Sequence, residues 1–399
     1  LHNENFWKSI PEQLTLFKLR ASYGVNGNQR GIGLYQAQGS YVPITAYAGN
    51  AAIQNTVLSN PNLQWERSKT LDGGADIGLF NNRVNILFDV YRRLTDNLLA
   101  SQSLPLSTGF TSIVTNLASL ENKGFEVELN SRILPASSPL QWEVSLNAAK
   151  VRTTITKLPE NGTPRNRIGG VLVWDTQSSS YEWKGGLQEG GRLGDLYAYK
   201  KIGIYGSDAE AAAGPVDMIV PGASKKKYGG DVIWEDLDKN NIIDDRDRVY
   251  MGNTYPEWTG GMSTSLGYKG FSLYTRFDFL TGITIFNAPQ QFFYTQASGN
   301  NNLTANVLRS WMKPGDEKNS PYPRFYYADQ QVSSNYVRGN SDNYESGNFM
   351  NLREVTLSYT LPKNLIKRAK ITNMRVYLTG NNLKYFTRYS GLNPEQGGL

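Results

Sequence analysis

A twelve-residue segment, 236–247, carries the side chains best suited to binding a metal ion. Aspartate or asparagine stands at its positions 1, 3, 5, 9 and 12, which is the ligand spacing of an EF-hand-type calcium loop. A backbone carbonyl serves at position 7 of such loops. The candidate ligands are Asp236, Asp238, Asn240, Ile242 through its carbonyl, Asp244 and Asp247. This spacing predicts a Ca²⁺ site.

The match has two departures and leaves one alternative open. Position 6, normally Gly, is Asn241, a residue that tolerates left-handed backbone. Position 12 is Asp247, which is shorter than the usual Glu. The same side chains could instead form Asx turns that need no metal. EF-hand loops join helices, whereas the flanks here resemble strands and turns. A calcium ion would therefore act as a structural staple, with a dissociation constant of about 10⁻⁴ to 10⁻³ M as in extracellular modules.

Residues that could support catalysis are scarce. The chain has no Cys and a single His, His2, which excludes a disulfide scaffold, a zinc site and nucleophilic catalysis by Cys or His. Glu126 and Glu128 could suggest a glycosidase. Catalytic carboxylates usually face each other from different elements, however, and these two share one strand face, where a polar stripe explains them better. We predict that the protein is not an enzyme.

The distribution of charge and the aromatic residues of the predicted loops do not identify a ligand. The net charge of +6 is spread out, and the one tight basic run, Lys225–Lys227, lies in a Gly-rich segment. We interpret this run as a solvated loop and expect no nucleic-acid partner. Aromatics mixed with amides and hydroxyls occur in 173–183, 290–296 and 324–330. Such surfaces can stack on sugars or grip peptides, but they can equally pack loops together, so the substrate-binding residues stay unknown.

The elements that must position these residues are strands. In 82–93 (NRVNILFDVYRR) Val84, Ile86, Phe88 and Val90 share one face, and Arg83, Asn85 and Asp89 share the other. Such alternation is typical of half-buried antiparallel strands. The segments run to about 10 residues, which matches the roughly 9 to 11 of a tilted strand crossing a bilayer better than the roughly 5 to 6 of a globular strand.

Nine strand candidates alternate with short and long connections. The strands are 14–24, 67–79, 83–94, 122–132, 140–150, 258–268, 271–281, 349–360 and 373–381. The long connections are 25–66, 95–121, 151–257 and 282–348. Outer-membrane barrels have this asymmetry, with short periplasmic turns and long extracellular loops. The pattern therefore predicts a transmembrane β-barrel whose long loops, including the Asp-rich segment, lie outside the cell.

Several stretches, in this order, resemble the C-terminal part of SusC/RagA-type TonB-linked outer-membrane proteins of Bacteroidetes. They are KLRASYGVNGNQ (18–29), 60–99, 116–133, 191–205, 231–279, FMNLREVTLSYTLPKNL (349–365) and 374–395. The resemblance implies an all-β fold, a large antiparallel barrel of about 22 strands when complete. This chain would supply roughly nine or ten C-terminal strands. The family's N-terminal plug and first barrel half have no counterpart here, and we expect the chain to be part of a longer one.

The resemblance also implies a function. Such proteins import a nutrient, an oligosaccharide or a peptide, across the bacterial outer membrane. They work with a SusD-type lipoprotein lid, often as dimers of transporter–lid pairs, and TonB acts on the N-terminal part. The partners expected here are that lid, TonB and outer-membrane lipid. The alternative is a secreted β-protein with a calcium-stapled loop that binds or hydrolyses carbohydrate. It would show polar outer strand faces, in place of an apolar belt about 25 Å tall.

Overall fold

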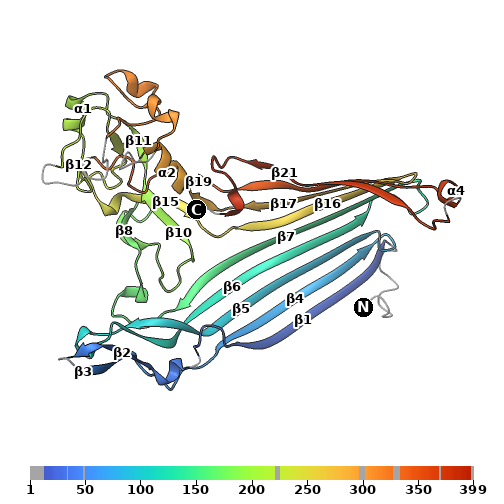
Figure 1. The fold of residues 1–399 in the computed structure, drawn as a ribbon, viewed down its shortest axis with the longest axis horizontal. Coiled ribbons are helices and arrows are strands. Elements are labelled where there is room, and N and C mark those ends of the chain that lie inside the picture. Colours follow the sequence, from blue (N-terminus) through green and yellow to red (C-terminus); the bar gives the residue numbers. More distant parts are fainter. Residues whose placement is uncertain are drawn as a thin grey trace.

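Nine strands form one antiparallel sheet in the computed structural model, which describes residues 13–33, 35–47, 50–220, 225–295, 302–326, 333–367 and 370–396. The strands are β1 (Leu14–Asn28), β4 (Glu66–Leu79), β5 (Val84–Ser103), β6 (Ser112–Arg132), β7 (Leu140–Lys157), β16 (Trp258–Tyr268), β17 (Phe271–Thr281), β20 (Phe349–Thr360) and β21 (Arg375–Thr387). Each strand pairs with the next one in this order, and β1 and β21 form the two edges (Figure 1). All nine predicted strands are confirmed.

Residues aligned across the sheet form rows of alternating character. One row is apolar apart from a glycine: Leu19, Ala75, Phe88, Val127, Ala148, Gly260, Phe279, Met350 and Phe386. The adjacent row, one residue along each strand, is mostly polar: Lys18, Asp76, Leu87, Glu128, Asn147, Gly261, Asp278, Asn351 and Tyr385. Because successive side chains point to opposite faces of a strand, the sheet has one apolar and one polar face.

The polar face is the concave one. It lines a cavity of about 740 Å³ whose polar residues include Asp89, Glu126, Glu128, Asn147 and Asp278. On the opposite face the large apolar side chains of Phe88, Leu146 and Leu273 are exposed. This is the arrangement of an outer-membrane barrel, which turns its polar face to the lumen and its apolar face to lipid. Among the described residues, no helix is long and apolar enough to cross a membrane.

Short and long connections lie at opposite ends of the sheet, as predicted (Figure 1). The short ones are 80–83, 133–139, 269–270 and 361–374, the last with α4 (Lys363–Ile366). The predicted long loop 95–121 is wrong in extent, because β5 and β6 continue as a paired hairpin and the connection between them is only 104–111. Bulges between Thr95 and Leu98 and between Leu98 and Ala100 shift the register there, which removes the simple alternation from the sequence.

The long connections carry secondary structure of their own. The 29–65 connection contains β2 (Ser40–Tyr47) and β3 (Asn50–Val57). The 158–257 connection holds β8 (Val171–Asp175), β9 (Ser180–Lys184), β10 (Asp195–Tyr199), β11 (Lys201–Ile204), α1 (Asp208–Ala213), β12 (Val216–Asp217), β13 (Val232–Trp234), β14 (Ile242–Ile243) and β15 (Arg248–Asn253). The 282–348 connection holds β18 (Thr284–Phe286), α2 (Ala288–Thr295) and β19 (Tyr344–Ser346). Short 3-10 turns are η2 (Gln36–Gln38), η3 (Leu106–Thr108), η4 (Pro164–Asn166), η5 (Asp245–Asp247), η6 (Ala305–Arg309), η7 (Asp316–Lys318) and η9 (Pro394–Gln396).

The described parts of 158–257 and 282–348 pack together at the long-loop end of the sheet, and we call them the loop domain (Figure 1). Its small apolar core contains Tyr199, Val232, Trp234 and Ile243, with Ile219 packed against it. A main-chain bridge between Tyr199 and Asn340 links the two segments. The two connections are therefore one structural unit, although strands β16 and β17 separate them in sequence.

Candidate functional site

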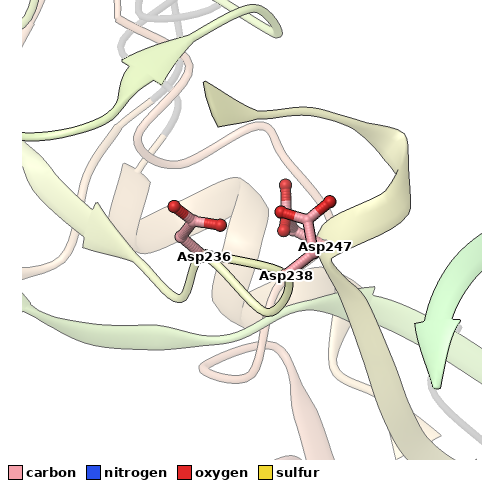
Figure 2. A group of neighbouring side chains, drawn as sticks. All are labelled: Asp236, Asp238 and Asp247. Atoms are coloured by element: carbon pink, nitrogen blue, oxygen red, sulfur yellow. The ribbon is translucent and has the colours of Figure 1, made fainter. Parts of the chain in front are cut away.

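The Asp-rich segment forms a turn between β13 and β15 that gathers three carboxylates. One oxygen from each of Asp236, Asp238 and Asp247 lies within 4.8 Å of the others, and Figure 2 shows these side chains on neighbouring stretches of chain. Asn241 has a φ of 65°, the left-handed conformation that position 6 of a calcium loop requires. The spacing of the sequence thus located three acidic side chains that meet in space.

The remaining candidate ligands have other partners. The Asp244 carboxylate accepts from the Arg246 Nε at 2.8 Å and caps η5 by accepting from the Arg246 N–H. The Asn240 side-chain oxygen accepts from the Ile242 N–H at 2.7 Å. Among the three converging carboxylates, Asp236 also accepts from the backbone N–H of Asn241 at 2.8 Å. These local bonds are the Asx-type contacts of the metal-free alternative.

Asp247 is the buried member of the three carboxylates. This side chain is buried, and it accepts from the N–H groups of Leu237 at 2.9 Å and Asp244 at 2.8 Å. Burial, with a smaller contribution from Asp238 and Asp236, raises the pKa of Asp247 to about 6. Ionising this carboxylate therefore costs free energy that a nearby divalent cation would offset.

The β8–β9 hairpin rests on this turn. Tyr181 donates its hydroxyl to the Asp238 carboxylate at 2.5 Å, and the Arg246 guanidinium lies 5.2 Å from the Tyr181 ring centre. On the hairpin Tyr181 packs edge-on against Trp174, at 5.0 Å between ring centres. The Asp-rich turn is therefore bonded directly to the β8–β9 hairpin, which carries one of the three aromatic segments noted in the sequence.

The other two aromatic segments lie partly outside the described residues. Segment 290–296 contributes the end of α2 up to Thr295, and 324–330 is described only up to Tyr326. In the described part, the Arg324 guanidinium lies 4.2 Å from the Tyr326 ring centre and 4.9 Å from that of Tyr228. These rings are therefore already engaged with a protein cation.

A buried ionic cluster in the loop domain was not predicted. Asp217 accepts two bonds from the Arg338 Nη2, at 2.9 and 3.0 Å, and lies 3.2 Å from the Lys227 Nζ. The side chains are only 2%, 2% and 3% exposed for Asp217, Arg338 and Lys227. The prediction of a solvated loop is thus wrong for Lys227, which also donates to the Ser333 carbonyl at 2.9 Å. Burial lowers the pKa of Lys227, against the opposing effect of Asp217.

A second buried carboxylate extends this network. Asp231 accepts from the Arg324 Nε and from the Asn335 Nδ2, both at 3.0 Å. The Asn335 side-chain oxygen in turn accepts from the Val232 N–H at 3.0 Å. These bonds join the 158–257 connection to the 282–348 connection, which shows how charged residues hold the loop domain together where apolar residues are few.

The paired glutamates lie where the polar-stripe interpretation places them. Glu126 and Glu128 line the concave cavity of the sheet together with Asp89 and Asp278. Neighbouring charges on this face are paired: Arg20 bonds Asp76 at 2.8 Å and Asp89 at 2.9 Å. Arg353 bonds Asp278 at 2.7 Å. A polar face with several ion pairs suits a hydrated lumen.

Comparisons with known proteins agree with this architecture. Residues 7–224 match the family model described as TonB dependent receptor-like, beta-barrel. TonB-dependent receptor P3 of Formosa agariphila is 32% identical over 399 residues, which cover 98% of this chain and 37% of that protein. TonB-dependent receptor SusC of Bacteroides thetaiotaomicron is 24% identical over 415 residues, covering 99% of this chain and 36% of that protein.

A solved structure shares the fold. The structure of the RagAB peptide transporter matches with a TM-score of 0.74 and 24% sequence identity, covering 100% of this chain and 40% of the matched chain. This chain therefore spans about two fifths of the length of the proteins that it resembles.

Proposed function

Because this chain belongs to the TonB-dependent receptor β-barrel family, a family of outer-membrane proteins, we propose that the protein imports a bulky nutrient across the outer membrane. The observation that carries the proposal is the two-faced sheet. An apolar row runs across nine strands on one face, and paired charges line the concave face. A secreted enzyme or binding module would cover such an apolar face with a second layer, whereas Phe88, Leu146 and Leu273 are exposed here.

The substrate class and the partners follow by analogy. A SusC-type relative and a peptide transporter of the same fold support an oligosaccharide or a peptide as cargo. We propose that a SusD-type lipoprotein lid covers the long-loop end, which carries the loop domain. We also propose that TonB drives the protein, and that transporter–lid pairs form dimers as in the family. Residues 29–65, 104–111, 158–257 and 282–348 would then face the outside of the cell.

Uptake by living cells tests the import proposal. A strain lacking the protein is grown on single oligosaccharides and on peptide mixtures, and is compared with the complemented strain and with a strain depleted of TonB. We expect one nutrient class whose uptake is lost in both mutants and restored by complementation. Unchanged uptake of every nutrient, or recovery of the protein in a fraction that needs no detergent, would contradict the proposal.

We further propose that the Asp-rich turn binds Ca²⁺ through Asp236, Asp238 and Asp247 and thereby steadies the β8–β9 hairpin. Support comes from the convergence of the three carboxylates and from the raised pKa of Asp247. Asn240, Ile242 and Asp244 complete the predicted ligand set, and Asp244 would have to share its carboxylate between the ion and Arg246.

Asp236→Asn should weaken Ca²⁺ binding by about tenfold, about 1.4 kcal/mol, since it removes one of three converging charges. Terbium luminescence of the detergent-purified protein reads the site through the nearby Tyr181. Asp245→Asn is the matched control, because Asp245 lies in the same segment but bonds Arg248 and Tyr199. We also expect proteolysis of the β8–β9 hairpin to become faster when calcium is chelated. Equal terbium affinity in both variants, or a rate of proteolysis that does not change on chelation, would contradict the calcium site and support the Asx-turn interpretation.

A further inference from the structure

Basic side chains gather at one end of the apolar face of the sheet. Arg92, Lys123 and Arg152 lie directly opposite one another on β5, β6 and β7, and all three are exposed. Their neighbours along the strands, Arg93 and Val151, line a cavity of about 630 Å³ on the concave face. Because successive side chains point to opposite faces of a strand, the three cations project from the apolar face. We call them the basic row.

The basic row lies beside an aromatic cluster, toward the long-loop end of the sheet (Figure 1). Two residues along the strands, about 7 Å closer to the centre of the sheet, the same face carries Phe125, Lys150 and Trp258. Trp258 packs edge-on against Phe125 at 5.3 Å between ring centres, and the Lys150 Nζ lies 5.2 Å from the Trp258 ring centre. Aromatic residues of outer-membrane barrels gather at the membrane interface. The basic row therefore lies at the height of the lipid headgroups.

The short-turn end of the same face is uncharged. On β4 to β7, a row near that end is Leu79, Val84, Ser131 and Val144. On β7 and the strands that follow it, the last paired row is Leu140, Tyr268, Phe271, Tyr359 and Val376. The cations are thus specific to the end of the sheet that meets the long loops.

Carboxylates balance only part of the charge in the basic row. Glu121 bonds the Arg92 Nε and lies 2.6 Å from the Lys123 Nζ, so one carboxylate serves two cations. Within the part of the chain that the structure describes, Arg152 has no ion-pair partner. Like charges placed directly opposite each other on neighbouring strands are destabilising. An additional anion beside Arg152 would offset this repulsion.

Strand β4 repeats the imbalance on the same face. The Arg67 Nε and the Lys69 Nζ both bond the Asp96 carboxylate, at 2.9 and 2.6 Å. Lys69 is two residues from Leu71, which lies opposite Arg92, so these cations adjoin the basic row. This end of the apolar face therefore carries more positive charge than its own carboxylates neutralise.

We propose that the basic row binds the phosphate of a lipid headgroup in the outer leaflet of the outer membrane, while Phe125 and Trp258 pack against the lipid below it. Anionic headgroups attract basic clusters at a membrane surface, and the guanidinium of Arg152 suits a phosphate. The choice of leaflet rests on the proposed orientation, in which the long loops face the outside of the cell. Lipid binding itself does not depend on import.

Lipid titration followed by native mass spectrometry tests the site on the intact detergent-purified protein. The probes are phosphatidic acid and diacylglycerol with the same acyl chains, which differ only in the phosphate. We expect phosphatidic acid to bind about tenfold more tightly, or better. Equal binding of the two lipids would overturn the proposal, and so would displacement of phosphatidic acid by an equal concentration of inorganic phosphate, since that result marks a site for a free anion.

Variants show where the phosphate binds. Arg152→Gln loses no ion pair and should weaken binding of phosphatidic acid about fivefold without changing that of diacylglycerol. Lys123→Gln should give a similar loss, whereas Arg152→Lys keeps the charge and should retain most of the affinity. Arg93→Gln removes a cation from the concave face of the same sheet and is the matched control. Equal affinity in wild type and Arg152→Gln, or an equal loss in Arg93→Gln, would contradict the assignment.

Discussion

Leu146→Arg should remove most of the folded protein from the outer membrane. Leu146 lies on the apolar face of β7, paired with Leu129 and Met262 on its neighbours, and its side chain is exposed. An arginine facing lipid near the bilayer midplane costs about 2 to 4 kcal/mol. We expect a roughly 30-fold or larger shift toward unfolded protein, measured as loss of the heat-modifiable band in the membrane fraction.

The adjacent residue provides the matched control. Asn147 belongs to the polar row, paired with Glu128 and Gly261, and lines the concave cavity. Asn147→Arg introduces the same charge one residue along the same strand, but on the hydrated face beside an acidic neighbour. It should assemble close to wild-type levels. Equal loss for both variants would mean that the assignment of the two faces is wrong.

Asp217→Ala should open the loop domain and leave the barrel intact. The substitution removes the carboxylate that Lys227 and Arg338 share. Their side chains are only 3% and 2% exposed, so both charges would be buried without this partner. Breaking a buried ion pair by removing one partner costs about 3 to 5 kcal/mol. We expect rapid proteolysis within 158–257 and 282–348, whereas the heat-modifiable behaviour of the barrel is unchanged.

An exposed pair in the same domain gives the comparison. Glu235→Gln breaks the bond from the Lys200 Nζ, which is 3.0 Å long and solvent-accessible. Exposed pairs contribute about 0 to 1 kcal/mol, so this variant should resist protease like the wild type. Equal protease sensitivity in Asp217→Ala and Glu235→Gln would show that the buried cluster does not hold the domain together.

The sheet could be predicted because the environment of each strand residue shows in the alternation of polar and apolar residues along that strand. In a barrel strand each side chain meets either lipid or a hydrated lumen, so the alternation from Val84 to Val90 reports both faces directly. Prediction failed where a bulge interrupts that alternation, as it does after Thr95. The sequence there no longer shows which residues share a face, although the hairpin itself continues to Ser103 and Ser112.

The loop domain could not be predicted because its contacts join residues that are far apart in the sequence. Asp217 and Arg338 are 121 residues apart, and each on its own reads as an ordinary charged loop residue. Their burial depends on partners that local pattern does not reveal. The Asp-rich turn lies between these cases. The spacing of the sequence located Asp236, Asp238 and Asp247, but it did not show that the Asp244 carboxylate is bonded to Arg246.

The split of the loop domain into two segments has a consequence for biogenesis. Lys201 bonds Asp342 across 141 residues, and the hairpin of β16 and β17 lies between the two partners. During synthesis and export, Lys227 and Asp217 of the first segment can pair with each other, but Asp217 lacks its bonds from Arg338 until the second segment has been delivered. Since domains fold as units, this one closes only after the intervening hairpin has been delivered. Closure then joins the two chain segments that follow directly on the outer ends of β16 and β17, so the loop domain can form only after this part of the barrel has been synthesised.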